Sequence, residues 1–312
     1  MRRFSTVGAF CFLALVALER SAGTLRADLL YGADSTTNSL VTVNDVTGAL
    51  TTIGSFGLIN QTINGLAFDP LNGNLYGYGN FHGSGGSSAG LVQINTTTGQ
   101  ATVIGIGSGS QLSQVSSLAF NSAGTLFAKY NPSGLDTLAT INVTTGTATP
   151  YTTSPPFPGV PTNDGALAGN GGSTLVNITP SSNNSNVQTV DTNTGTLTTV
   201  GQWSSTGGAL IETMNGGMSF NGTLYYFEGA DENNADAPTL YTLNLNTLDV
   251  ESVAAFSPND QLTGLAFQPQ LASTPEPGSL ALLTLAITGW GGMALARRRR
   301  RGQAPVPAAP AT

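Results

Sequence analysis

The side chains able to do chemistry are few in this chain. His82 is the only histidine, and it lies in the Gly/Ser-rich run at 81–86. A single histidine leaves one candidate base for a catalytic triad and excludes a metal site built from several histidines. Because runs rich in glycine and serine usually form loops, we expect His82 to be an exposed loop residue rather than a catalytic base.

Two other features could suggest a catalytic or phosphate-binding site, but their surroundings do not fit one. Gly86-Ser87-Ser88-Ala89-Gly90 matches the nucleophile-elbow pattern, which needs a strand before the serine and a helix after it. A strand-like segment, Leu91–Ile94, follows instead, so we interpret the match as coincidence. Lys129 follows no glycine-rich run and predicts no phosphate loop. Cys11, the only cysteine, lies in the apolar segment near the N-terminus, so the mature chain should have no thiol chemistry.

An acidic run is the strongest candidate for a ligand site. It contains Glu228, Asp231, Asn233 and Asp236, whose oxygen atoms are of the kind that binds Ca²⁺. The spacing fits no standard calcium loop, because the glycine that such a loop needs at its turn is absent. We therefore favour a solvated acidic loop over a weak calcium site, and we expect no other cofactor.

The charges of the chain are unevenly placed. Between Asp28 and Thr274 there are fifteen acidic residues and one base, Lys129, so the formal charge of this span is 1 − 15 = −14. Binding to a phosphate backbone requires Lys or Arg, so the sequence predicts no interaction with nucleic acid. Charged residues make up only 9% of the chain, which has 40 glycines, and such a composition favours short strands joined by turns over long helices.

A repeat of about 50 residues organises the middle of the chain. In each copy an apolar strand ends in Asn or Asp, and a glycine follows four positions later. Asn or Asp opens a turn with its side chain, and glycine closes it with a positive φ, so each copy predicts a hairpin. A fifth copy has Leu248 in place of the glycine. The four complete copies are Asn44–Gly48, Asn95–Gly99, Asn142–Gly146 and Asp191–Gly195.

A second pair of strands precedes each hairpin, as in Gly65-Leu66-Ala67-Phe68 followed by Leu75-Tyr76. The run Gly165-Ala166-Leu167-Ala168, which leads into Leu175-Val176, is a degraded copy. Four short strands in each unit are typical of propeller blades. The other two complete copies begin at Ser117-Leu118-Ala119-Phe120 and Gly217-Met218-Ser219-Phe220.

The two ends of the repeat array are complementary. Leu29–Gly32 is a second strand without a first, whereas Gly264–Phe267 is a first strand with nothing after it. Pairing them would complete a blade and remove exposed sheet edges. The sequence thus predicts an all-β domain at residues 28–270, a five-bladed β-propeller closed by its N- and C-terminal strands. A stacked sandwich or a β-solenoid is the alternative, but a solenoid would not need complementary half-units.

The N-terminus is typical of a secretory signal peptide, which we place at residues 1–27. Arg2 and Arg3 supply a positive start, and Val7–Leu18 is an apolar run too short to span a bilayer. Cleavage after Gly23 or Ala27 is consistent with the small residues there. The alternative is an uncleaved anchor.

The C-terminus carries three features in order. A linker at 271–278 contains Pro275-Glu276-Pro277, an uncharged stretch covers 279–296, and a tail at 297–312 begins with Arg297, Arg298, Arg299, Arg300 and Arg301. As a helix, the uncharged stretch would span about 27 Å, close to the thickness of a hydrocarbon core. The arginines should stay in the cytoplasm and leave everything before Pro275 outside.

This order of features resembles the PEP-CTERM sorting signal of Gram-negative and related bacteria, over about residues 274–301. The resemblance implies that an exosortase-type membrane protease reads Pro275, Glu276 and Pro277 and cleaves near them. It further implies an inner-membrane-anchored intermediate, then release to the cell surface or extracellular matrix, often alongside exopolysaccharide. Gly302–Thr312, a Pro/Ala tail, departs from the family pattern. A plain C-terminal anchor is the alternative and would have the same topology.

These observations favour an exported, non-enzymatic protein with a recognition or structural role at the cell surface. The alternative is a secreted propeller enzyme acting on polysaccharide, either a lyase or a glycoside hydrolase. Such an enzyme would need a pair of carboxylates, and no single pair stands out in the sequence.

Overall fold

The computed structural model describes residues 29–58, 61–83, 86–106, 112, 115–131, 136–157, 165–179, 186–205, 211–213, 217–231, 238–257 and 260–269. All regular secondary structure in these residues is β-strand. Within this part of the chain, no helix has the length and hydropathy that crossing a membrane requires. The predicted signal peptide (1–27), linker (271–278), membrane helix (279–296) and arginine tail (297–312) lie outside the described residues.

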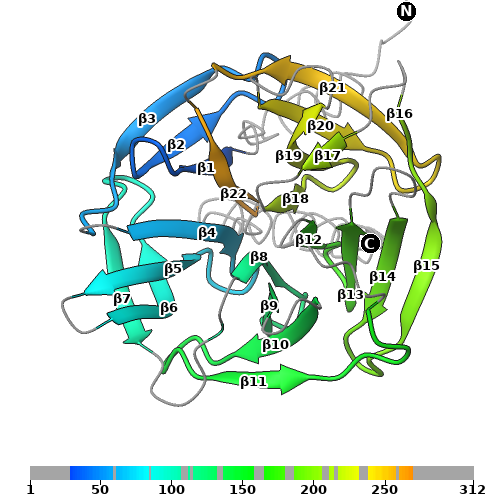
Figure 1. Ribbon diagram of the computed structural model, residues 1–312, viewed down its shortest axis with the longest axis horizontal. Coiled ribbons are helices and arrows are strands. Elements are labelled where there is room, and N and C mark those ends of the chain that lie inside the picture. Colours follow the sequence, from blue (N-terminus) through cyan, green and yellow to red (C-terminus); the bar gives the residue numbers. More distant parts are fainter. Residues whose placement is uncertain are drawn as a thin grey trace, which may run out of the picture. The chain divides into compact units, whose positions relative to one another are not determined.

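Five sheets, antiparallel in their four main strands, are arranged around a central axis, with the first of these strands nearest the axis (Figure 1). The fold is therefore a five-bladed β-propeller, as the repeat predicts. Blade 1 contains β22 (Leu262–Phe267), β1 (Leu30–Asp34), β2 (Ser39–Val43) and β3 (Leu50–Ser55); blade 2 contains β4 (Gln61–Phe68), β5 (Leu75–Gly83), β6 (Gly86–Ile94) and β7 (Ala101–Ile106); blade 3 contains β8 (Val115–Phe120), β9 (Leu126–Tyr130), β10 (Thr137–Ile141) and β11 (Ala148–Tyr151).

The remaining two blades follow the same plan. In blade 5 the inner strand β18 pairs with β19, and two short strands, β16 and β17, extend the sheet. Blade 4 contains β12 (Ala166–Gly169), β13 (Thr174–Thr179), β14 (Asn186–Asp191) and β15 (Leu197–Gln202); blade 5 contains β18 (Met218–Phe220), β19 (Tyr225–Asp231), β20 (Thr239–Leu243) and β21 (Asp249–Ala255), with β16 (Ser204–Ser205) and β17 (Ile211–Thr213).

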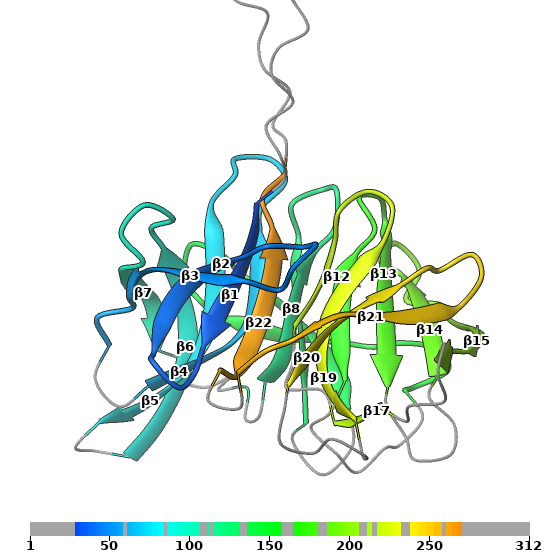
Figure 2. The ribbon, with the colours of Figure 1, turned by 90° about the horizontal axis from the view of Figure 1, so that it is seen from above.

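The ring closes through the composite blade. β22 pairs with β1 in antiparallel register, with Phe267 opposite Leu30 and Leu265 opposite Gly32. Figure 2 shows these two strands side by side although more than 220 residues separate them. The pairing continues beyond the strands, because the backbone N–H of Gln268 donates to the carbonyl of Leu29 at 2.9 Å. The predicted closure is confirmed, and the linear stacking of a solenoid is excluded for these strands.

The hairpin between the third and fourth strands is the same in all five blades. The residue that closes the turn donates its N–H to the Asn or Asp carbonyl four residues earlier, at 2.8 Å each time. In the first four blades that residue is a glycine with φ between 69° and 78°. In blade 5 it is Leu248, which adopts φ 61°, so the conformation persists without the glycine.

Each hairpin turn contacts the fourth strand of the preceding blade. The contacting position lies six residues after the closing residue of that strand's own turn, as in Gly99 to Gly105. A Cβ added at Gly105 would overlap the carbonyl of Thr145 in the next turn. The five positions are Gly54, Gly105, Thr152, Gly201 and Ala254, and the turn residues beside them are, in order, Gly99, Gly146, Gly195, Leu248 and Gly48.

In the degraded fourth copy, the strand register shifts the repeat by one residue from the match expected from the sequence. In β12, Gly169 lies opposite Leu175, as Phe120 lies opposite Leu126 in blade 3. The phenylalanine position of the repeat is therefore occupied by Gly169, and not by Ala168 as expected. A larger residue would not fit there, because a Cβ at Gly169 would overlap the carbonyl of Phe120.

The hydrophobic core lies between the blades. The phenylalanine at the end of an inner strand packs against a tyrosine of the preceding blade, as Phe68 does with Tyr31 at a ring-centroid distance of 5.4 Å. The same pairing joins Phe120 to Tyr76 and Phe267 to Tyr226. Edge and tilted contacts of this kind are favourable geometries for aromatic rings. These contacts help to hold neighbouring blades together.

Candidate functional site

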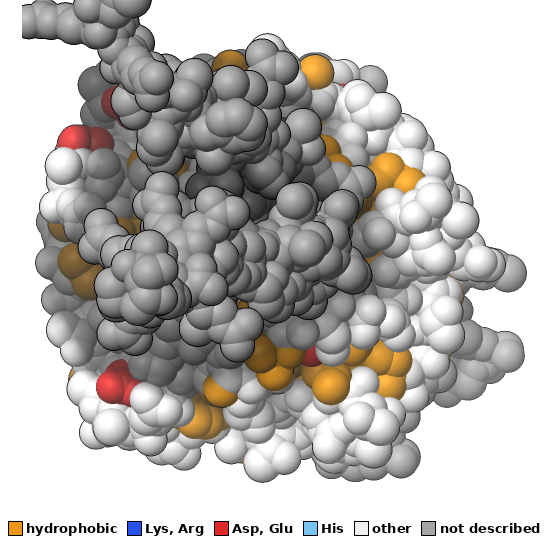
Figure 3. Space-filling view, turned by 180° about the vertical axis from the view of Figure 1, so that it is seen from behind, with side chains coloured by type: hydrophobic (Ala, Val, Ile, Leu, Met, Phe, Trp, Pro, Cys, Tyr) orange, Lys and Arg blue, Asp and Glu red, His pale blue; other side chains and the backbone are white. Residues whose placement is uncertain are grey.

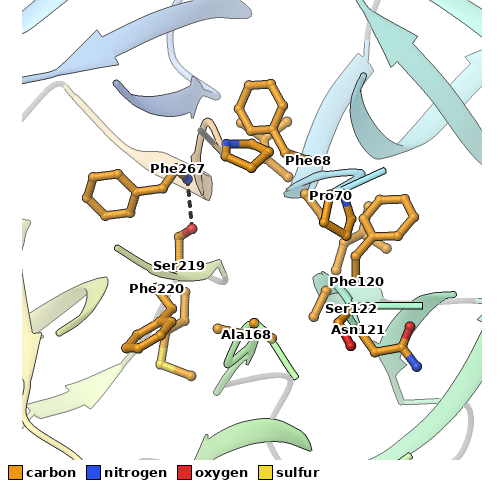
Figure 4. A pocket seen from close by; sticks show the side chains of 17 residues that line it. Phe68, Pro70, Phe120, Asn121, Ser122, Ala168, Ser219, Phe220 and Phe267 are labelled. Atoms are coloured by element: carbon orange, nitrogen blue, oxygen red, sulfur yellow. Dashed lines mark hydrogen bonds between the residues drawn. The ribbon is translucent and has the colours of Figure 1, made fainter. Parts of the chain in front are cut away.

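A pocket lies on the axis where the inner strands β4, β8, β12, β18 and β22 end (Figure 4). Its volume is about 130 Å³. Phe68, Phe120, Phe220 and Phe267 line its rim, and Ala168 and Gly169 take the corresponding place in blade 4. In Figure 4 the four phenyl rings point away from the centre of the pocket. Those of Phe68, Phe120 and Phe267 pack against tyrosines of neighbouring blades.

The pocket wall carries neutral polar groups. Asn121 and Ser122 come from the turn that follows β8, and Ser219 comes from β18. The Oγ atom of Ser219 accepts a hydrogen bond from the N–H of Phe267 at 2.7 Å, which joins blade 5 to blade 1 (Figure 4). The described residues of the wall contain no charged side chain. Such a wall suits contact with a small neutral group.

Below the pocket the inner strands approach each other through their backbones. A Cβ added at Gly264 would lie 2.7 Å from the N atom of Leu66, and one at Gly65 would lie 2.8 Å from the N atom of Leu118. Gly65 also has φ 80°, which a residue with a side chain rarely adopts. The space between the inner strands is therefore narrow at this level. The pocket itself has room for about four water molecules.

A buried ion pair lies in blade 3, away from the pocket. Lys129, near the end of β9 that points away from the pocket, is fully buried, and its Nζ lies 2.9 Å from the Oδ2 of Asp136. Burial raises the pKa of the Asp136 carboxyl, and the charge of Lys129 opposes that shift. Gly165, with φ 122°, passes so close that a Cβ there would overlap the Lys129 ammonium. The only base of the predicted ectodomain is therefore a buried, paired cation between blades 3 and 4.

Other polar side chains are buried at a similar depth in blades 4 and 5. The side-chain amide of Asn177 donates to Gln188 Oε1 at 3.0 Å and to Thr179 Oγ1 at 3.1 Å. Glu228 is 1% exposed and lies in β19. Buried groups of this kind remain stable because they are hydrogen-bonded or paired. The hydrogen bonds of Asn177 join β13 to β14 within blade 4.

Glu228 corrects an expectation from the sequence. It is not part of a solvated acidic loop, because it belongs to a buried strand; Asp231 is the last residue of that strand. Asn233 and Asp236 lie outside the described residues. The described part of the chain contains no group of three or more His, Cys, Asp or Glu side chains placed to bind a metal. The calcium hypothesis thus gains no support from Glu228.

His82 and the serines of the nucleophile-elbow match also lie in strands. His82 belongs to β5 and pairs with Ser87 of β6, so its backbone is part of a long hairpin and not of a loop. Ser87 and Ser88 continue into the same strand as Leu91, and no helix follows them. The strand–serine–helix arrangement of a nucleophile elbow is therefore absent here, in agreement with the interpretation of the motif as coincidence.

The buried ion pair was not predicted from the sequence, although a signal for it existed. Lys129 is the only base between residues 28 and 274, and it follows the apolar run Leu126-Phe127-Ala128 in the second strand of a repeat unit. A charge at such a position implies a buried partner. The repeated phenylalanine was visible in the sequence, but its position beside an axial pocket became evident only with the closed propeller.

The described surface is mostly neutral. On the face in Figure 3, the described atoms are mainly white, with a few acidic side chains in red, small groups of hydrophobic side chains in orange and no blue Lys or Arg. The exposed faces of the outer strands carry threonines, among them Thr51, Thr102 and Thr198. A surface of this kind favours neutral or cationic partners over anionic ones.

Comparison with known proteins identifies the family. The family model described as "Repeat of unknown function (DUF6923)" matches residues 60–247, from the start of blade 2 to the last hairpin turn of blade 5. The chain belongs to the DUF6923 family. In this DUF6923 protein, the matched repeat is thus a set of propeller blades with Asn/Asp-opened hairpins. No curated protein matches the chain.

Solved structures similar to the DUF6923 chain are distant. TolB from Acinetobacter baumannii is 15% identical, with a TM-score of 0.43 over 74% of this chain and 52% of that protein. A putative 6-phosphogluconolactonase from Bacteroides fragilis is 11% identical, with a TM-score of 0.42 over 79% and 99%. An engineered GH43 glycoside hydrolase is 11% identical, with a TM-score of 0.46 over 71% and 48%. The chain spans about half the length of the TolB and glycoside hydrolase structures.

Proposed function

We propose that this protein is exported and displays its propeller at the cell surface or in the extracellular matrix, where it has a non-enzymatic recognition or structural role. In this proposal residues 1–27 direct export, residues 279–296 anchor an intermediate in the inner membrane, and an exosortase-type protease reads Pro275, Glu276 and Pro277. The arginines at 297–301 would hold the tail in the cytoplasm.

The observation that carries this proposal is that both ends of the propeller meet at one place. Leu29 and Gln268 are joined by a backbone hydrogen bond of 2.9 Å, and Pro269 lines the axial pocket. The predicted signal peptide precedes one end directly, and the predicted sorting segment follows the other within seven residues. A closed ring with both ends at one side can be tethered or released there without disturbing a blade.

The chemistry of the pocket supports recognition over catalysis. Its described lining is uncharged and includes the neutral polar residues Asn121 and Ser122. Side-chain amides and hydroxyls bind neutral ligands by hydrogen bonding. Extracellular polysaccharide is the partner that fits this chemistry and the proposed location.

The test is to follow the chain in cells with and without the sorting protease. We expect surface or medium fractions to contain a form whose C-terminus, measured by intact mass, lies near Pro275, and protease-deficient cells to keep the tail in the membrane fraction. Recovery of the chain through Thr312 from the surface would contradict processing. Retention in the cytoplasm would contradict export and with it the proposal.

An assay of polysaccharide turnover distinguishes the proposed binding role from the alternative, a polysaccharide-degrading enzyme. If the purified chain released reducing ends or unsaturated sugars from polysaccharide, and if Glu228→Gln abolished that release while the unfolding midpoint stayed unchanged, the protein would be a lyase or hydrolase. We expect binding without turnover.

A further inference from the structure

A polar groove of about 390 Å³ lies on blade 2, between its two turns at the pocket end of the propeller. Its volume is within the range of known ligand pockets. Leu75 and Ile94, whose side chains are buried in the core, also line the groove. Seven neutral polar residues surround it, and the described lining has no charged side chain: Asn74, Gln93, Asn95, Thr96, Thr97, Gln100 and Thr102.

Blade 2 departs from the repeat at the residues that form this groove. Gln93 lies opposite Thr102 in the neighbouring strand, and the corresponding cross-strand residue in each of the other four blades is a threonine. Three of those threonines donate to the opposite carbonyl at 3.4 Å, as Thr42 does to Thr51. Glutamine replaces this compact arrangement with a longer side chain carrying an amide. The four threonines are Thr42, Thr140, Thr189 and Thr242.

Two more departures occur around the same groove. Gln100 takes a position held by Ala49, Thr147, Thr196 and Asp249 in the other blades. The first turn of blade 2 spans Asp69–Asn74, one residue longer than Asn121–Thr125 and two longer than Asn221–Leu224. Asn74, the last residue of this turn, lines the groove. Gln93 and Gln100 are exposed, so the packing of the core does not require them.

The chemistry of the groove indicates its ligand class. A side-chain amide donates two hydrogen bonds and accepts two, and a threonine hydroxyl does both, so these groups match a ligand rich in hydroxyl groups. Anionic ligands find no base in the described lining, and the surrounding ectodomain has a formal charge of −14. Nucleic acid and polyuronates would be repelled. A neutral glycan satisfies both conditions.

We propose that the blade 2 groove binds an uncharged polysaccharide through the amides of Gln93 and Gln100. The inference rests on the proposed recognition function and gives it a site and a ligand class. Asn74, Asn95 and Thr102 lie around the same groove and would supply further hydrogen bonds along a glycan chain.

The test is affinity electrophoresis of the purified full-length chain in detergent. Native gels would contain dextran, xyloglucan or galactomannan as neutral probes, and alginate as the anionic one. We expect at least one neutral probe to retard the chain and alginate to have no effect. The double variant Gln93→Thr and Gln100→Thr gives blade 2 the residues that other blades carry. It should fold normally and weaken binding about tenfold, as expected for the loss of two ligand hydrogen bonds.

A matched control is the pair Thr140→Gln and Thr147→Gln on blade 3, where the turn is shorter; it should leave retardation at the wild-type level. Retardation of the blade 2 variant equal to wild type would overturn the site while leaving glycan recognition in place. Failure of all three neutral probes would overturn the ligand class. Neither result bears on export or processing, which the fractionation experiment decides separately.

Discussion

Two equivalent junctions between blades reach the same backbone arrangement with different residues. Between blades 2 and 3, Gly105 faces the turn that contains Gly146, and the two backbones touch directly. Between blades 4 and 5, Gly201 faces the turn that contains Leu248, and the leucine side chain fills the space between them. The first junction has no side chain at either position, whereas the second has one.

The difference shows that the repeat conserves a backbone conformation more strictly than a residue type. Gly146 has φ 71° and Leu248 has φ 61°, so both turns close in the left-handed region. Leucine pays about 1–2 kcal/mol for that conformation. Packing of Leu248 against the cluster around Phe227 and Tyr241 offsets this cost.

We expect the largest effect when the leucine of the blade 5 turn is introduced at the equivalent position of blade 3. Gly146→Leu introduces left-handed strain of about 1–2 kcal/mol and overlap with Gly105 of about 1–3 kcal/mol, so we expect the free energy of unfolding to fall by about 2–5 kcal/mol. Urea unfolding measures it. Gly222→Leu is the control, because Gly222 has φ 96° with open space around it and isolates the strain. Equal losses in the two variants would mean that the junction is not tightly packed.

A smaller effect is expected from adding a methyl group at the fourth-strand glycine. Its size should depend on whether the neighbouring atom belongs to the backbone or to a side chain. Gly105→Ala places a methyl group against the carbonyl of Thr145, which cannot move without shifting the turn, so we expect a loss of about 1–3 kcal/mol. Gly201→Ala meets the Cδ1 atom of Leu248, the end of a flexible side chain, and should cost less than about 1 kcal/mol. Equilibrium unfolding of both variants tests the order. A reversed order would show that Leu248 is held rigidly.

The architecture was predictable because its signals are local and repeated. The Asn/Asp-to-Gly spacing gave the hairpins, and the complementary half-units at Leu29–Gly32 and Gly264–Phe267 gave the closure. The left-handed Leu248 was not predictable, since only the surrounding contacts make that conformation acceptable. The shift to Gly169 was also hidden, because its cause is the nearby carbonyl of Phe120 in another blade.

The candidate sites were less predictable. The blade 2 groove depends on departures such as Gln93 and Gln100, which are visible only after the blades have been aligned by their register. The Lys129–Asp136 pair joins residues seven apart, and the burial that makes the pair significant comes from blade 4. The sequence shows which residues are unusual, whereas the structure shows which of them share a surface.

The smallest effect should come from restoring the glycine in blade 5. Leu248→Gly removes left-handed strain of about 1–2 kcal/mol and gives up a half-buried leucine side chain worth a similar amount, so the free energy of unfolding should change by less than about 1 kcal/mol. Urea unfolding of the single variant and of the double variant with Gly201→Ala forms a double-mutant cycle. The cost of Gly201→Ala should disappear once the leucine is absent. A loss above about 2 kcal/mol for Leu248→Gly alone would mean that packing, and not the turn conformation, determines the residue at this junction.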